Sequence, residues 1–134
     1  MKPCIVYFSR TGNTKRMAEA IAELTKAPMF DLTSSDPSVV ANYDFLFIGT
    51  PVEGFRPAKE TMKFVERLPN AEGKKTVLFC TYMLFKGVTF STLEKALTNK
   101  GYKCILKVSK KGLRPNKPAD FSQCIDEIKK ALMK

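Results

Sequence analysis

The fold is decided by the stretch Ile5-Val6-Tyr7-Phe8-Ser9-Arg10-Thr11-Gly12-Asn13-Thr14. It starts inside a continuous apolar run over residues 3–9, which is typical of a strand buried on both faces. The residues that follow, 14–26, place their apolar side chains at helical spacing. Between the two lies a short polar segment with three hydroxyls, an amide and a glycine. The stretch therefore predicts a strand, a tight polar turn and a helix in direct succession.

The polar turn has the properties of a phosphate-binding loop. Gly12 allows the backbone to turn tightly, and the first turn of a helix has N–H groups without partners inside the helix. These groups and the helix dipole attract an anion. Arg10 adds a positive charge, although its side chain can equally point to water. An ordinary helix N-cap is the alternative, but the direct junction of strand and helix favours a phosphate contacted by the residues Ser9, Arg10, Thr11, Gly12, Asn13 and Thr14.

The kind of phosphate ligand is narrowed by the motifs that the loop lacks. It matches neither the G-x-x-x-x-G-K-[ST] pattern of nucleotide hydrolases nor the G-x-G-x-x-G pattern of dinucleotide enzymes. Hydroxyl donors in place of a lysine suit a terminal phosphate monoester held without a metal ion. The loop therefore favours a mononucleotide.

Short apolar runs alternate with helical periodicity along the rest of the chain. Further strands are expected over 28–33, 44–49, 75–81 and 102–108, and further helices over 57–68, 90–100 and 118–133. Such alternation is typical of right-handed βαβ units around a parallel sheet. We predict one α/β domain over residues 1–134, a three-layer sandwich whose five-stranded parallel sheet has the order 2-1-3-4-5 and helices on both faces. The ligand crevice then lies at the carboxyl ends of the strands, among the loops 9–14, 50–56 and 81–88.

The charge of the chain points to acidic partners. The net charge is +10, from 23 Lys and Arg against 13 Asp and Glu, and such a balance favours acidic surfaces. No arginine-rich tract or interleaved aromatic pattern is present, so nucleic acid is not the expected partner. No apolar run is long enough to span a bilayer, and the first residues lack a signal cleavage site. We therefore expect a cytoplasmic protein without membrane insertion.

The chain offers no catalytic constellation of its own. Histidine is absent, which excludes Ser-His-Asp and Cys-His arrangements. None of the cysteines forms a C-x-x-C pair, so a zinc site of the usual kind is not expected. The cysteines are expected to be small buried side chains, with Cys80 the one that falls near a possible ligand. Any redox chemistry must come from a cofactor.

The segments 5–14 and 43–52 together resemble the flavodoxin family. The first matches the family's phosphate loop, [ST]-x-T-G-x-T, and the second is similar to its third strand and following loop. The likeness is closer still to the flavodoxin-like half of flavodoxin–ferredoxin fusion proteins, in which a G-[ST]-P-V loop precedes an aromatic residue and a helix started by proline, as in Phe55-Arg56-Pro57. The resemblance implies an FMN cofactor bound in the crevice.

The other two crevice loops are expected to bind the flavin ring. In the second loop, the resemblance implies that Gly54 offers a carbonyl to the flavin N5–H while Phe55 covers one ring face. In the third, Tyr82 or Phe85 is the candidate for the other face, although this loop is apolar and carries Lys86 where flavodoxins have acidic and glycine-rich residues. The expected ring contacts are Thr50, Pro51, Val52, Glu53, Gly54, Phe55, Thr81, Tyr82, Met83, Phe85 and Gly87.

These observations favour an FMN electron carrier that shuttles electrons between redox protein partners. The basic chain predicts partners with an acidic docking face, slower association at high salt, and a monomer or weak dimer. It also predicts a second-electron potential less negative than that of an acidic relative, because nearby cations stabilise the anionic reduced flavin. Two alternatives remain open: an FMN-dependent reductase of a small acceptor such as a quinone, and a cofactor-free module that binds another phosphate ligand.

Overall fold

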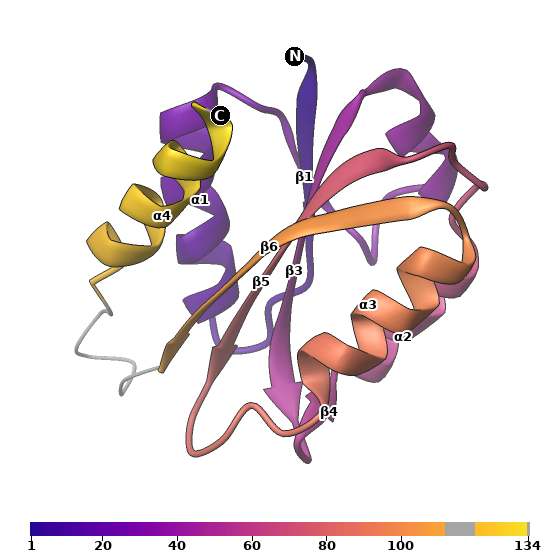
Figure 1. Ribbon diagram of the computed structural model, residues 1–134. Helices are drawn as coiled ribbons and strands as arrows, with labels where there is room; N and C mark the ends of the chain where they lie inside the picture. The colour runs from indigo at the N-terminus through magenta and orange to yellow at the C-terminus, as the bar shows by residue number, and fades with distance from the viewer. Residues whose placement is uncertain (112–119, 134) are drawn as a thin grey trace.

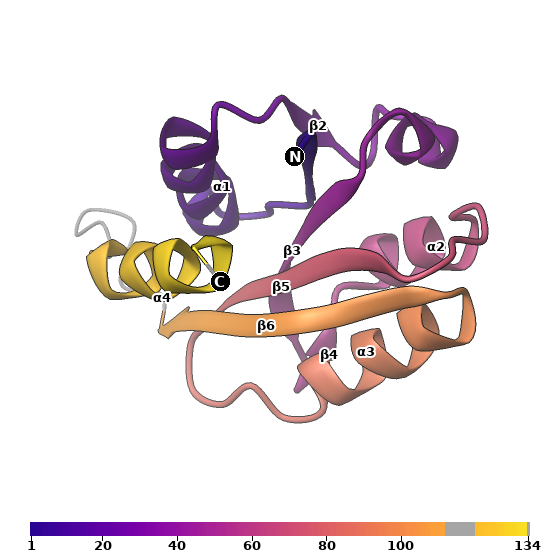
Figure 2. The same cartoon turned by 45° about the horizontal axis from the view of Figure 1, so that its top comes forward.

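Five parallel strands form the middle layer of the molecule (Figures 1 and 2). The computed structural model describes residues 1–111 and 120–133. The parallel strands are β1 (Pro3–Tyr7), β2 (Met29–Asp31), β3 (Phe45–Glu53), β5 (Lys74–Tyr82) and β6 (Tyr102–Lys111). Their spatial order is β2-β1-β3-β5-β6, so the predicted order 2-1-3-4-5 is confirmed when the parallel strands are counted along the chain.

Helices cover both faces of this sheet, which confirms the three-layer sandwich. In Figure 1, α1 (Asn13–Thr25) and α4 (Ser122–Leu132) lie on one side, and α2 (Lys59–Glu66) and α3 (Thr89–Asn99) on the other. The predicted last helix, 118–133, begins at Ser122, and its residues 118 and 119 lie outside the described residues.

The strands are apolar on both faces, and this explains the continuous apolar runs of the sequence. In β1, Cys4 and Val6 belong to the core beneath α2 and α3, whereas Ile5 and Tyr7 belong to the core beneath α1 and α4. The same alternation continues in β3 and β5. The two cores hold the sheet between the helix layers and fix its carboxyl edge.

Three features of the fold were not predicted. β3 runs past residue 49 to Glu53 and turns back as the two-residue antiparallel strand β4 (Arg56–Pro57). β6 runs past residue 108 to Lys111. The 3-10 helix η1 (Pro37–Asn42) precedes β3, and the Asp36 carboxylate caps it by accepting the Ser38 N–H at 2.9 Å. These elements are too short, or too polar, to show a period of their own.

Candidate functional site

Three loops meet at the carboxyl edge of the sheet, at the lower end of the molecule in Figure 1. They follow β1, β3 and β5. Together with the last residues of β3 and β5 and the first residue of α1, the loops after β1 and β5 line a cavity of about 110 Å³. Each of its nine lining residues is among the predicted contacts: Arg10, Thr11, Asn13, Pro51, Val52, Glu53, Thr81, Tyr82 and Met83. The topology thus brings residues from all three predicted loops to one crevice.

The first loop is a compact turn that leads into α1. Gly12 has a φ of +97°, a left-handed conformation that favours glycine. The Ser9 hydroxyl accepts the Gly12 N–H at 3.1 Å, which closes the turn. Asn13 and Thr14 are buried at the start of α1, while Thr11 is exposed. Ser9 Oγ also accepts the Lys15 N–H at 3.1 Å. Asn13, the first residue of α1, lines the cavity, so the N-terminus of the helix lies at the crevice, where a helix dipole favours an anion.

Two buried threonines join this loop to the third strand of the crevice. The Thr14 and Thr81 hydroxyl oxygens are 2.7 Å apart and form a hydrogen bond. Thr50 is also buried, but its hydroxyl points toward α2, where it accepts hydrogen bonds from the Ala58 N–H at 3.2 Å and from Thr61 at 2.9 Å. Thr50 thus joins the end of β3 to the start of α2 by hydrogen bonds and does not line the cavity.

Arg10 bridges the first loop to the second. Its guanidinium donates to Glu53 at 2.9 Å and to Glu60 at 2.9 Å through Nη2, and to Glu53 again through Nε. It also lies 4.8 Å from the centre of the Phe8 ring. The hydrogen bonds to Glu53 and Glu60 raise the pKa of Arg10 above its usual range. We call Arg10, Glu53 and Glu60 the arginine clamp.

The second loop is a tight two-residue turn between β3 and β4. Gly54 and Phe55 both have left-handed backbones, with φ of +59° and +65°, as a type I′ hairpin turn requires. This conformation is uncommon for a bulky residue such as Phe55, and it is a feature typical of functional sites. The Phe55 side chain is 53% exposed beside the crevice.

The third loop packs directly on that turn. The Val88 N–H donates to the Phe55 carbonyl at 2.9 Å, and the Phe55 and Phe85 ring centres are 6.3 Å apart. A β-carbon on Gly87 would lie 2.3 Å from the Phe55 carbonyl oxygen, so only glycine allows this approach. Because the Phe55 carbonyl is engaged, the Gly54 carbonyl remains the candidate partner of the flavin N5–H that the resemblance implies.

The second and third loops form an apolar surface beside the crevice. We call it the tip patch, and it comprises five exposed side chains, Phe55, Met83, Leu84, Phe85 and Val88. Tyr82 lies at its inner border and lines the cavity, with the Lys86 amine 5.9 Å from the centre of the Tyr82 ring. Val88 and Leu84 were not among the predicted contacts, because their exposure depends on how the two loops pack.

The comparisons with known proteins agree with this architecture. The family model described as a flavodoxin domain matches residues 4–111. The chain belongs to the flavodoxin family. It is 32% identical to a flavodoxin from Clostridium beijerinckii, over 94% of this chain and 96% of that protein.

Solved flavodoxin structures share the fold. A two-electron reduced flavodoxin from Megasphaera elsdenii superposes with a TM-score of 0.80 at 25% identity, over 96% of each chain. A flavoprotein from Lactobacillus acidophilus, solved in complex with FMN, superposes with a TM-score of 0.63 at 23% identity, over 81% of this chain and 92% of that one.

The crevice residues of this flavodoxin-family chain fit the two ends of FMN. The glycine turn and the N-terminus of α1 suit a phosphate. Tyr82 and the aliphatic Val52 line the same cavity as Arg10, Thr11 and Asn13 and suit a flat apolar ring. The exposed Phe55 ring, which packs against Phe85, adds a second aromatic surface on the neighbouring turn.

Cys4 and Cys80 are not placed for redox chemistry, and of the other two cysteines Cys124 is buried, as expected, whereas Cys104 is only half-buried. Cys80 is fully buried, and burial raises the pKa of its thiol to about 12. Cys4 is buried in the same way, with its pKa also raised to about 12. Within residues 1–111 and 120–133 no cluster of metal-ligating side chains occurs, and no helix has the length and apolar character needed to cross a membrane.

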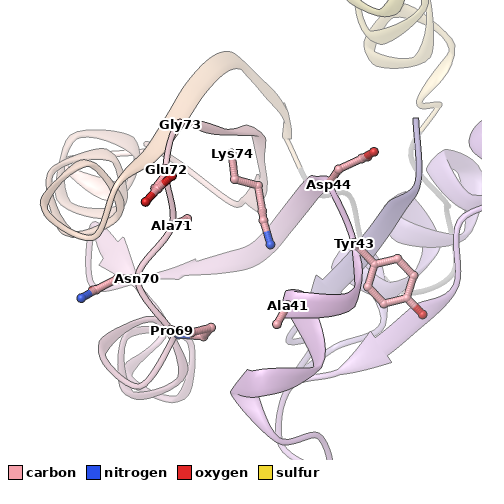
Figure 3. Close-up of a pocket in the computed structure, with 9 residues that line it drawn as sticks. All are labelled: Ala41, Tyr43, Asp44, Pro69, Asn70, Ala71, Glu72, Gly73 and Lys74. Carbon is pink, nitrogen blue, oxygen red and sulfur yellow. The ribbon is translucent and has the colours of Figure 1, made fainter.

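A larger hollow lies at the opposite edge of the sheet (Figure 3). Its volume is about 470 Å³, and it is lined by Ala41, Tyr43, Asp44, Pro69, Asn70, Ala71, Glu72, Gly73 and Lys74. The Lys74 amine donates to the Val40 carbonyl at 2.8 Å, so it serves to hold η1 against β5. This hollow contains none of the predicted cofactor contacts, and of the family-like segments it includes only Tyr43 and Asp44, at the start of 43–52.

Proposed function

We propose that this protein binds FMN in the crevice at the carboxyl edge of its sheet and carries electrons between redox proteins. The observation that carries the proposal is that residues from the predicted segments 9–14, 50–56 and 81–88 line one cavity at the carboxyl edge. Membership of the flavodoxin family supports FMN as the ligand. The bound flavin would supply the electron chemistry, since the protein lacks histidine and its most buried thiols, Cys4 and Cys80, are protonated.

The residues divide into two groups toward this cofactor. The first loop and the N-terminus of α1 would hold the phosphate through backbone N–H groups and the hydroxyls of Ser9 and Thr11. Phe55 and Tyr82 would cover the ring, and the Gly54 carbonyl would meet the flavin N5–H. The arginine clamp would keep the two loops at a fixed separation, so that phosphate and ring are bound together.

The partner proposal depends on the surface around the crevice. The tip patch leaves apolar side chains exposed beside the expected ring edge, and the chain has a net charge of +10. A redox partner with an acidic docking face suits this combination. The expected cytoplasmic location, the monomeric or weakly dimeric state and the absence of a nucleic-acid partner stay predictions.

Reconstitution with FMN tests the cofactor. The purified protein, stripped of ligand, is titrated with FMN, and the flavin fluorescence and visible spectrum are recorded. We expect quenching of the fluorescence and a shifted, structured absorption band at one FMN per chain. A colourless protein with unquenched FMN would support the alternative of a phosphate-ligand module.

Turnover assays test the carrier role. The reconstituted protein is mixed with a reduced nicotinamide and a quinone, first alone and then with a separate flavodoxin reductase. A carrier is reduced only when the reductase is present. Steady quinone reduction without the reductase would support the alternative of an FMN-dependent reductase.

A further inference from the structure

Two arginines flank the phosphate loop, and their surroundings differ. Arg10 is held by the carboxylates of Glu53 and Glu60, so its positive charge is cancelled locally. Arg16 donates through Nη1 to the neutral Asn13 amide oxygen at 2.6 Å. Among residues 1–111 and 120–133, the recorded ion pairs do not include Arg16. Arg16 therefore contributes a full positive charge next to the loop.

The position of Arg16 directs that charge at the loop. It is the fourth residue of α1 (Asn13–Thr25), and helical side chains lean toward the N-terminus of their helix. Its Nη2 lies 3.8 Å from the point that a β-carbon on Gly12 would occupy. Because Gly12 has no side chain, no side-chain atom of that residue lies between the Arg16 guanidinium and the backbone of the turn. The hydrogen bond to Asn13 holds the guanidinium in this place.

A cation beside the loop would strengthen its attraction for a phosphate monoester. The monoester carries a charge between about −1.5 and −2 at pH 7, while a helix N-terminus contributes only about half a positive charge. The loop side chains other than Arg10 are neutral. In the described part of the chain, neither Lys15 nor Arg16 forms an ion pair with a carboxylate, but only Arg16 of the two has a side chain recorded against the loop, beside Gly12 and on Asn13.

We infer that Arg16 is a charged ligand of the FMN phosphate and makes the site selective for phosphorylated over unphosphorylated flavin. This inference rests on the proposed function, because it requires FMN in the crevice. It assigns the two arginines different tasks: Arg16 recognises the phosphate, and Arg10 positions the ring loop through the arginine clamp. The two roles predict different effects on the binding of riboflavin, which has the ring without the phosphate. A substitution of Arg16 should leave riboflavin binding almost unchanged, whereas a substitution of Arg10 should weaken it.

The test compares FMN with riboflavin in single variants of the full chain. Dissociation constants are measured by flavin fluorescence for wild type, Arg16→Gln, Arg16→Lys and Arg10→Gln, at low and high salt. We expect Arg16→Gln to weaken FMN binding by roughly tenfold or more and to change riboflavin binding by less than about twofold. Arg16→Lys keeps the charge and should retain most of the affinity. Arg10→Gln should weaken both ligands to a similar extent.

A neighbouring lysine provides the matched control. Lys15 is exposed and one residue away, so Lys15→Gln removes the same charge without removing the proposed contact. Its effect on FMN should be at most about threefold and should vanish at high salt, because exposed charges are screened. Far-ultraviolet circular dichroism verifies folding of every variant, and Arg16→Met, which removes the charge but keeps an unbranched aliphatic side chain, carries the test if Arg16→Gln does not fold.

The outcomes separate this inference from the proposed function. Equal FMN affinities for Arg16→Gln and Lys15→Gln, with wild type binding FMN, would overturn the role of Arg16 alone. Failure of wild type to bind either flavin would overturn both proposals. A phosphorus NMR signal of bound FMN that changes in Arg16→Gln but not in Lys15→Gln would support the direct contact.

Discussion

At the residue scale, two glycines with almost the same φ angle have different neighbours. Gly54 and Gly87 have φ of +59° and +57°, but a β-carbon on Gly54 meets nothing within 4 Å, whereas one on Gly87 meets the Phe55 backbone. We expect Gly54→Ala to lower the free energy of unfolding by about 1–2 kcal/mol, the cost of a left-handed alanine. Gly87→Ala should cost more, because the third loop must also move away from Phe55.

Urea denaturation of the two alanine variants measures this difference. The pair is its own control, since the substitution and the backbone region are the same. Equal losses of stability would show that the contact between the second and third loops does not contribute to the folded state.

Burial of two thiols gives a second prediction at this scale. The pKa values of Cys4 and Cys80 are raised to about 12 from an ordinary value of 9.0, because burial disfavours the thiolate. The folded state therefore holds these protons more tightly than the unfolded state, and the resulting stability is complete below pH 9 and is lost between about pH 9 and 12. Unfolding curves at pH 8 and pH 10 should show a lower free energy of unfolding at pH 10.

A variant isolates the thiol contribution. In Cys80→Ala the fall in stability between these pH values should be smaller than in wild type. Labelling by a thiol reagent at pH 8 should be slow for Cys4 and Cys80 in the folded protein, because the reactive thiolate is scarce. Rapid labelling of Cys80 in the native protein would contradict its assignment as a buried, inert side chain.

At the element scale, the arginine clamp joins the loop after β1 to the end of β3 and the start of α2. The pKa of Glu60 is lowered, first by the hydrogen bond from its own backbone N–H and then by Arg10. We expect Arg10→Gln to raise the pKa of Glu60 while leaving the free energy of unfolding almost unchanged, since exposed ion pairs stabilise little. Carboxyl carbon NMR measures the titration, and an unchanged Glu60 pKa would contradict the clamp in solution.

The elements that could be predicted from the sequence are those with their own periodicity. The buried strands and the helices α1, α2, α3 and α4 follow from their apolar spacing, and the sheet order follows from the alternation of strands and helices. β4 could not be predicted, because Gly54-Phe55 is not among the usual I′ turn pairs. The contact of Gly87 with Phe55 depends on two loops far apart in the chain, and so does the clamp between Arg10 and Glu60. The sequence indicated which loops share the crevice, but not which side chains engage one another there.

At the scale of the whole molecule, the net charge of +10 predicts salt-dependent association with an acidic partner. Electrostatic attraction speeds encounter at low ionic strength, and added salt screens it. We expect the rate of electron transfer to an acidic redox protein, measured by stopped flow, to fall steeply between low and high salt. A basic redox protein of similar potential is the control, and a rate that is independent of salt for both partners would contradict electrostatic docking.

The second-electron reduction potential tests whether nearby or distant positive charges stabilise the reduced flavin. The Debye length is about 8–10 Å at ordinary ionic strength, so distant lysines are screened and those beside the crevice dominate. Lys86 lies over the Tyr82 ring at the inner border of the tip patch, whereas the charge of Arg10 is offset by its carboxylate partners. Lys86→Gln should therefore make the second-electron potential more negative by roughly 10–40 mV, from about 0.2–1 kcal/mol per exposed charge. Lys95→Gln removes the same charge from the exposed side of α3 and should leave the potential almost unchanged. Equal shifts in the two variants, measured by redox titration of the FMN-loaded protein, would show that net charge and not Lys86 sets the potential.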